Sequence, residues 1–205
     1  MTCPHKMTPT PAERERIYER EHRIAESLQR VLLRAPSGET LPGVCVEAFH
    51  EAVMDEAMVG GDSFDAFALD GDRVALVVAD ASGKGLAAAE RVAEIRFAPR
   101  AFLREHGDPW RALACLNDFV CDGKRLGMRD DSAFATLTLA VLSGASGETT
   151  CLCAGGEPPL VLRAGGAIAA VSVCGPALGL FPGQGYAAAT VPWGQETPSS
   201  SPRMG

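Results

Sequence analysis

The chain has 205 residues, a length that suits one domain, or one domain with a helical extension. Hydrophobic residues make up 46% and charged residues 22% of it, close to the average for globular proteins, which argues against wholesale disorder. Acidic residues outnumber Lys and Arg by 26 to 19, for a formal net charge of −7. This balance disfavours a nucleic-acid partner, because such proteins normally carry a basic surface.

The two ends of the chain and the cysteines indicate the compartment. No apolar run approaches 18 residues, and the N-terminal segment lacks the apolar core of a secretory signal, so we expect no membrane span and no export. The seven cysteines include no Cys-x-x-Cys pair and are typical of buried, reduced thiols. The expected localisation is cytoplasmic.

The first predicted element is a helix. Residues 1–12 and the tail 192–205 are expected to be disordered, whereas residues 13–35 are expected to form a linker helix that Pro36 ends. Its apolar residues recur on one helical stripe: Ile17, Ile24, Leu28, Val31 and Leu32. The stripe fits either a helix packed on its own domain or a helix that dimerises, and two heptads are too few to decide.

Residues 36–191 are expected to form one α+β domain, because strands come first, two helices follow and strands return. Asp70 and Gly71, between two apolar runs, predict a β-hairpin. Pro99 is expected to kink or divide the first helix, and Asp108 to cap the second. The predicted strands are 44–49, 64–69, 73–79, 133–142, 149–154, 159–163 and 167–173. The predicted helices are 86–96, continuing with a kink or a break at Pro99 before His106, and 109–120.

Acidic residues concentrate early in this domain. Nine of them, and no Lys or Arg, lie between Arg34 and Arg73; most are expected to face water, and the alternative is that they hold a cation. Asp62 follows two glycines, and Asp80 ends an apolar strand before a glycine-rich turn into a helix. Carboxylates at the ends of adjacent hairpin strands can converge as oxygen ligands for Mg²⁺ or Mn²⁺.

The turn after Asp80 is a candidate phosphate site, because the N–H groups at a helix N-terminus attract anions. We expect Ser82, Gly83 and Lys84 to contribute to it. A P-loop is excluded, since Val78 stands where its first glycine should be and Gly85 where its Ser or Thr should be. The four histidines lack metal-ligand spacing, and no Gly-x-Ser-x-Gly surrounds a serine nucleophile.

Six segments of the sequence carry a pattern in a fixed order: AESLQR at 25–30, VGGDSFD at 59–65, VADASGKG at 78–85, FATL at 134–137, AGGEPP at 154–159 and GPALGL at 175–180. In this order they resemble motifs of one protein family, the bacterial metal-dependent serine/threonine phosphatases of the PPM (type 2C) superfamily, in the stage II sporulation protein E branch that regulates sigma factors. Gly156 replaces the histidine usual in the fifth motif.

The resemblance implies an α-β-β-α sandwich preceded by a helix, with two Mn²⁺ or Mg²⁺ ions at one end. Asp62, Asp80 and the backbone carbonyl of Ala81 would help to hold the metals. A metal-activated hydroxide would then hydrolyse phosphoserine or phosphothreonine without a phosphoenzyme. The substrate implied is a phosphorylated anti-sigma-factor antagonist, so the function expected is signalling.

One departure bears on activity. The family has two further metal aspartates in C-terminal motifs, but this sequence contains no Asp after Asp131. The resemblance ends near Val191, which we interpret as a truncation or a frameshift that removes C-terminal elements of the fold. We therefore expect impaired activity. The alternatives are a non-catalytic relic that binds a phosphoprotein partner or forms a homodimer through its N-terminal helix, and a generic acidic cation-binding domain.

Overall fold

The computed structural model describes residues 10–32, 41, 43–49, 61–83, 86–127 and 133–193. Of the segments expected to be disordered, 1–12 and 192–205, residues 1–9 and 194–205 lie outside this part of the chain. The expectation is wrong for residues 11 and 12, which belong to a helix, and for Pro192, which belongs to a strand. The helices are α1 Pro11–Leu32, α2 Leu86–His106 and α3 Pro109–Arg125. The strands are β1 Asp62–Ala68, β2 Arg73–Ala81, β3 Ala135–Ser143, β4 Glu148–Ala154, β5 Leu160–Leu162, β6 Ile168–Ala170 and β7 Ala188–Pro192.

Five strands form one antiparallel sheet in the order β1-β2-β3-β4-β7. The predicted hairpin is its first pair: β1 and β2 are joined through Gly71, whose φ of 75° lies in the left-handed region that glycine adopts without strain. Strand β7 was not predicted. It pairs with β4 and forms the second edge of the sheet, opposite β1.

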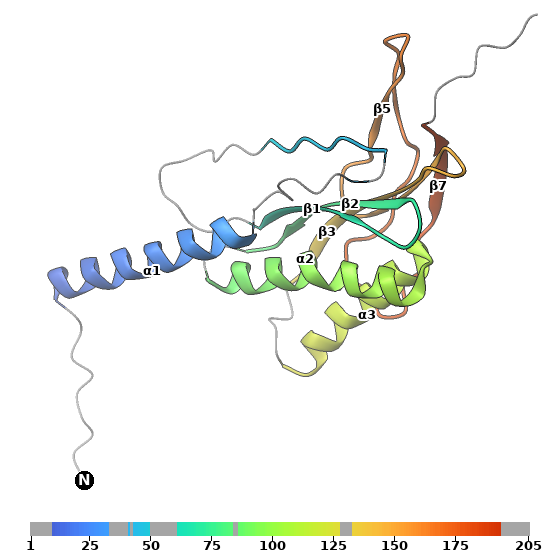
Figure 1. Cartoon of the computed structure of the whole chain (residues 1–205). Coiled ribbons are helices and arrows are strands. Elements are labelled where there is room, and N and C mark those ends of the chain that lie inside the picture. The colour runs from blue at the N-terminus through green and yellow to red at the C-terminus, as the bar shows by residue number, and fades with distance from the viewer. Residues whose placement is uncertain are drawn as a thin grey trace, which may run out of the picture.

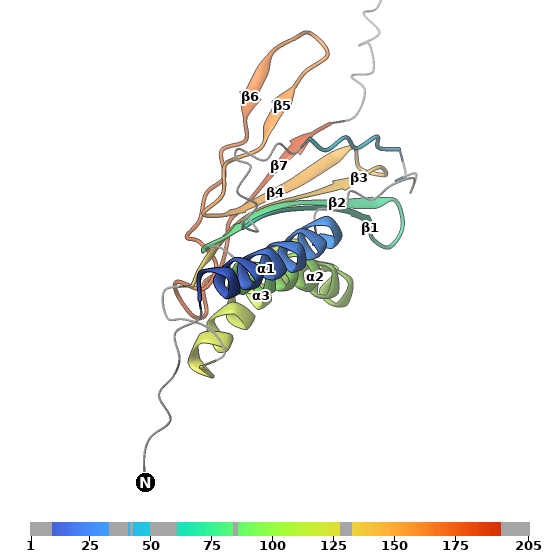
Figure 2. The same ribbon diagram turned by 90° about the vertical axis from the view of Figure 1, so that its left-hand side faces the viewer.

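Helices α2 and α3 cover one face of this sheet (Figures 1 and 2). Their apolar residues, among them Val92 and Leu116, pack on Phe67, Leu139 and Leu152 of the strands in a single buried core. As predicted, Asp108 caps α3, because its carboxylate accepts hydrogen bonds from the first backbone N–H groups of the helix. Pro99 does not divide α2, which continues through it to His106.

Helix α1 lies beside α2 (Figure 2). It begins at Pro11, two residues earlier than predicted. Of the predicted apolar stripe, the side chains of Ile17 and Ile24 are described, and they are 50% and 45% exposed. Contact with α2 therefore leaves this part of the stripe largely open to solvent. No described helix is long and apolar enough to cross a membrane.

The opposite face of the sheet is covered only in part. Leu41 and Val44 pack on Ala66 and Val74 at one flank, and Val171 and Val173 pack on β4 at the other. The prediction of a strand at 44–49 is wrong for the part described: residues 45–49 are extended but have no strand partner among the described residues. The small hairpin of β5 and β6 rises on this side of the sheet, away from the helices (Figure 2).

Candidate metal and phosphate site

The β1–β2 hairpin brings the two predicted aspartates together. Asp62 is the first residue of β1 and Asp80 the last but one of β2, and the register of the ladder places them directly opposite each other. Side chains in directly opposed positions point to the same face, with Cβ atoms about 4.5–5.5 Å apart. The face is the one without helices, so both carboxylates are exposed at the end of the sheet.

The two carboxylates are electrostatically unbalanced. Although the Asp80 residue is exposed, partial burial of its carboxyl, and then the negative charge of Asp62, raises the pKa of this carboxyl above its usual value. No Lys or Arg in the described ranges forms an ion pair with either aspartate. A pair of acids held together without a counter-charge is the donor set that a hard divalent cation stabilises, so these residues fit Mn²⁺ or Mg²⁺.

Gly61 brings the chain close to the backbone carbonyl of Ala81, the oxygen that the resemblance implies as a metal ligand. Its backbone passes so close to β2 that an added Cβ would lie 1.9 Å from the carbonyl oxygen of Ala81 and 2.3 Å from Oδ1 of Asp80. The Ala81 N–H also donates to the Gly61 carbonyl at 2.9 Å. Only glycine fits here, and the close approach gathers the Asp80 carboxylate and the Ala81 carbonyl beside Asp62.

In the described part of the chain, only two carboxylates come together at this end of the hairpin. No group of three or more His, Cys, Asp or Glu residues gathers there in a way that could hold a metal ion. The set assembled on the hairpin is therefore Asp62, Asp80 and the Ala81 carbonyl. Such a set can hold a cation only together with water or with ligands from elsewhere.

The predicted phosphate-binding turn is described as far as Gly83; Lys84 lies outside the described residues. Ser82 is held by the start of β3: its N–H donates to the Phe134 carbonyl at 2.9 Å, and its Oγ accepts from the Phe134 N–H at 3.0 Å. The backbone donor of Ser82 is thus already used. Gly83 has a φ of 107°, a backbone conformation that glycine adopts without strain.

Asp65 corrects one prediction. It belongs to the acidic run expected to face water or to hold a cation, yet it is 3% exposed and forms a two-point ion pair with Arg100 of α2, at 2.5 and 2.7 Å. Arg100 also lies over the ring of Phe67, 4.6 Å from its centre. The signal available was alternation, since Asp65 and Phe67 share the strand face that the helices cover.

Arg91 was missed by the sequence reasoning. It lies on α2, and its Nη2 is so close to Gly83 that an added Cβ there would be 2.2 Å away. This contact joins a helix to a loop, and no local sequence motif predicts it.

Gly156 lies close against β3. An added Cβ would lie 2.5 Å from Oγ1 of Thr138 and 3.1 Å from the Leu137 carbonyl carbon. A side chain here, including the histidine of the resemblance, would require Thr138 to change its side-chain conformation and the Leu137 backbone to shift slightly.

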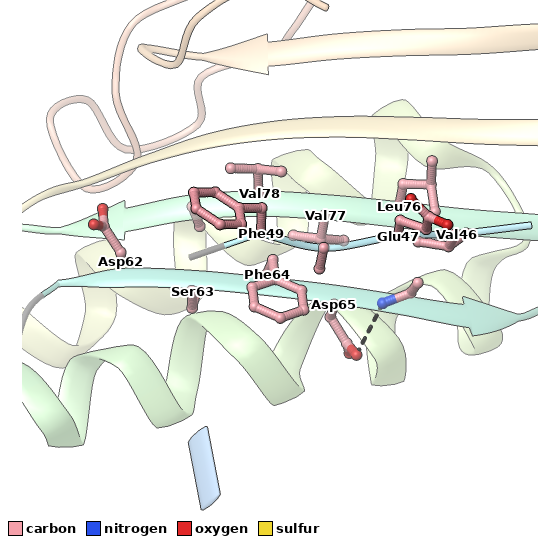
Figure 3. Close-up of a pocket in the computed structure, with 13 residues that line it drawn as sticks. Val46, Glu47, Phe49, Asp62, Ser63, Phe64, Asp65, Leu76, Val77 and Val78 are labelled. Carbon is pink, nitrogen blue, oxygen red and sulfur yellow. Dashed lines mark hydrogen bonds between the residues drawn. The ribbon is translucent and has the colours of Figure 1, made fainter. Parts of the chain in front are cut away.

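Beside Asp62, the open face forms a groove with a volume of about 450 Å³. The extended segment 46–49 forms one wall, and side chains of β1 and β2 form the floor (Figure 3). The groove is mostly apolar: Phe49 is 88% exposed and Val78 is 62% exposed. Asp62, at one end of the hairpin, is part of its lining.

Comparisons with known proteins agree with this architecture. A sequence model of the stage II sporulation protein E (SpoIIE) family matches residues 70–197, six residues beyond the point where the resemblance was expected to end. Protein IcfG of Synechocystis is 28% identical over 149 residues, which is 60% of this chain and 23% of that protein. This chain thus spans about a quarter of the length of that curated relative.

Solved structures share the fold. The RsbU and RsbW domains of Rv1364c from Mycobacterium tuberculosis are 31% identical, with a TM-score of 0.56 over 69% of this chain and 38% of that one. The SiaA-PP2C domain of Pseudomonas aeruginosa is 18% identical, with a TM-score of 0.65 over 90% of this chain and 70% of that one. The PP2C phosphatase domain of SpoIIE from Bacillus subtilis is 19% identical, with a TM-score of 0.55 over 65% and 38%. The mixed helix and antiparallel-sheet fold is therefore that of PP2C-type phosphatases, and the chain belongs to the SpoIIE family.

Proposed function

We propose that this chain is a metal-dependent protein phosphatase domain that hydrolyses phosphoserine or phosphothreonine on a regulatory protein. One observation carries the proposal: the β1–β2 register opposes Asp62 and Asp80, and the close approach of Gly61 adds the carbonyl of Ala81. Family membership supports the reaction class.

Each residue of the site would have a separate role in the reaction. Asp62, Asp80 and the Ala81 carbonyl would hold Mn²⁺ or Mg²⁺, and the hydrogen bonds of Ser82 to Phe134 would fix the turn that carries Ala81. A bound cation would lower the pKa of water and neutralise charge on the phosphoryl group. The sequence has no Gly-x-Ser-x-Gly motif around a serine nucleophile, which favours direct attack by water.

The substrate that the resemblance implies is a phosphorylated anti-sigma-factor antagonist. The occurrence of an RsbU domain together with an RsbW domain in a similar solved protein is consistent with a regulatory protein partner. The exposed Ile17 and Ile24 of α1 favour a homodimer through this helix as part of the proposal.

We also propose that turnover by this chain alone is low. Two divalent ions carry four positive charges, and the two carboxylates gathered on the hairpin balance only half of them. The loss of supporting groups at a metal site typically reduces affinity or activity about 10–100-fold each. The second candidate function is accordingly a non-catalytic domain that binds a phosphoprotein, favoured by the same count of two carboxylates.

The test is turnover of a phosphoserine peptide and of a generic phosphoester at millimolar Mn²⁺, with and without EDTA. Slow, metal-dependent hydrolysis that Gly61→Ala abolishes is the expected result, because the added Cβ would collide with the Ala81 carbonyl. Gly165→Ala is the control, since a Cβ at Gly165 meets open space. Hydrolysis that persists undiminished in EDTA would rule out the metal mechanism. Binding of the peptide without hydrolysis at any Mn²⁺ concentration would favour the non-catalytic domain.

A further inference from the structure

The segment GPALGL at 175–180 joins the main sheet at the end where β3 begins. Its residue Leu178 is 0% exposed and pairs with Ala135, the first residue of β3. The Leu178 N–H donates to the Ala135 carbonyl at 2.8 Å, and the Ala135 N–H donates to the Leu178 carbonyl at 3.2 Å. The segment therefore fixes the backbone at the start of this strand.

The start of β3 in turn holds the end of β2. Ala135 is the ladder partner of Ala81, whose carbonyl belongs to the candidate metal site. Next to this pair, the Ser82 N–H donates to the Phe134 carbonyl at 2.9 Å, and the Phe134 N–H donates to Ser82 Oγ at 3.0 Å. A displacement of Leu178 would therefore reach Ala81 through two adjacent backbone pairs.

A buried side chain of α3 fixes the same segment. Asn117 is 0% exposed; its Oδ1 accepts from the Gly179 N–H at 3.0 Å, and its Nδ2 donates to the Phe181 carbonyl at 2.9 Å. The Tyr186 hydroxyl also donates to Oδ1, at 3.3 Å. An amide suits this position because it offers a donor and an acceptor at once. Both backbone groups that it binds lie within three residues after Leu178.

Two more contacts hold the segment on α3. Lys124 Nζ donates to the Gly179 carbonyl at 2.8 Å, and a Cβ added at Gly179 would lie 2.6 Å from Cγ1 of Val120. Gly179 thus lies directly against the helix, one residue after the pair with β3. Because buried polar groups that lose their partners cost free energy, these bonds favour one arrangement of the segment between α3 and the sheet.

We propose that Asn117 is a positioning residue of the candidate metal site. It holds residues 178–181 on α3, and through Leu178 and Ala135 it sets the position of the Ala81 carbonyl at the end of β2. The inference rests on the proposed function, because it concerns a group that would hold the cation. The rival explanation is that Asn117 only stabilises the fold. Its removal would then loosen the whole sheet, whereas the loss of a positioning residue loosens the metal end first.

The experiment combines amide hydrogen exchange, followed by NMR, with Mn²⁺ affinity measured by calorimetry, both on the full chain. The first variant is Asn117→Ala, which removes both bonds to the segment. The second is Lys124→Met, which removes only the bond to the Gly179 carbonyl and tests the same link if the first variant does not fold. The matched control is Asp108→Ala, which removes the N-cap at the start of the same helix.

Exchange is followed at two sets of amides: a metal-end set, Ala81, Ser82 and Ala135, and a mid-sheet set in β3, Leu139 and Val141. Asn117→Ala is expected to speed exchange in the metal-end set about 5–30-fold relative to the mid-sheet set, the effect of one or two lost hydrogen bonds on a local opening. Mn²⁺ affinity should fall about 3–10-fold, less than the loss of about 10–100-fold for a group that contacts a metal ligand directly. Lys124→Met should give the same pattern with a smaller amplitude.

Asp108→Ala should affect the two amide sets alike and leave the Mn²⁺ affinity unchanged. Asn117→Ala that behaves as this control does overturns the inference. So does a loosened metal-end set without any change in Mn²⁺ affinity. If the unaltered chain binds no Mn²⁺, the proposed function fails, and the exchange pattern alone decides whether Asn117 holds this end of the sheet.

Discussion

The two faces of the five-stranded sheet are built from the same strands but differ in what covers them. On one face, alternate residues such as Val77, which is 2% exposed, are buried under α2 and α3. On the other, their immediate neighbours lie under short extended segments or under nothing, and Val78 is 62% exposed. The first face holds the fold together. The second carries the aspartates and the groove beside them, so stability and chemistry are separated across the thickness of one sheet.

The largest expected effect is on the covered face. Leu152 of β4 is 0% exposed, and Leu152→Ala should lower the free energy of unfolding by about 3–5 kcal/mol, because it leaves a cavity between the sheet and the helices. Urea denaturation measures the change. Leu160→Ala in β5, where the side chain is 69% exposed, is the control and should change stability by less than about 0.5 kcal/mol. Similar losses of stability in both variants would show that the exposed β5–β6 hairpin contributes as much to stability as the helix-covered face of the sheet.

The ion pair between β1 and α2 should come next. Asp65→Asn leaves Arg100 without its charged partner, at a position where the Asp65 side chain is 1% and the Arg100 side chain 31% exposed. We expect a loss of about 2–3 kcal/mol, less than for a fully buried pair because water reaches the arginine. In a double-mutant cycle with Arg100→Met, the double mutant should lose less stability than the sum of the losses in the two single mutants. Strict additivity would mean that the pair does not couple the helix to the strand.

Two adjacent residues of β2 give the sharpest contrast between the faces. Val77→Thr places a hydroxyl in the helix-covered core and should cost about 1–3 kcal/mol, because the hydroxyl is buried among apolar groups. Val78→Thr makes the same change on the open face and should cost less than about 0.5 kcal/mol. Equal losses in chemical denaturation would mean that the open face is covered in solution.

Local patterns predicted the elements whose signal lies in a few neighbouring residues. The Asp70-Gly71 turn and two flanking apolar runs gave the hairpin, and with it the convergence of Asp62 and Asp80. Asp108 predicted the start of α3, because an aspartate before a proline is a typical N-cap. These features depend on contacts between residues close in sequence, so a short stretch of sequence is enough to predict them.

The features that escaped prediction depend on partners far along the chain. Residues 44–49 alternate as a strand does, but alternation does not supply a neighbouring strand. Strand β7 is the reverse case, a short segment that pairs with β4 although its own pattern is weak. Asp65 and Arg91 act through α2, and only the packed helix shows which side chains it brings to the hairpin and the turn.

The central claim, that the hairpin forms a cation site from Asp62 and Asp80, is tested most directly by calorimetric titration with Mn²⁺. The unaltered chain should bind the ion, and Asp80→Asn should weaken binding at least about 10-fold, since even supporting groups at metal sites are worth that much. Asp72→Asn, at the other end of the hairpin just before β2 begins, should leave the affinity unchanged. Equal affinities for Asp80→Asn and Asp72→Asn would contradict the account.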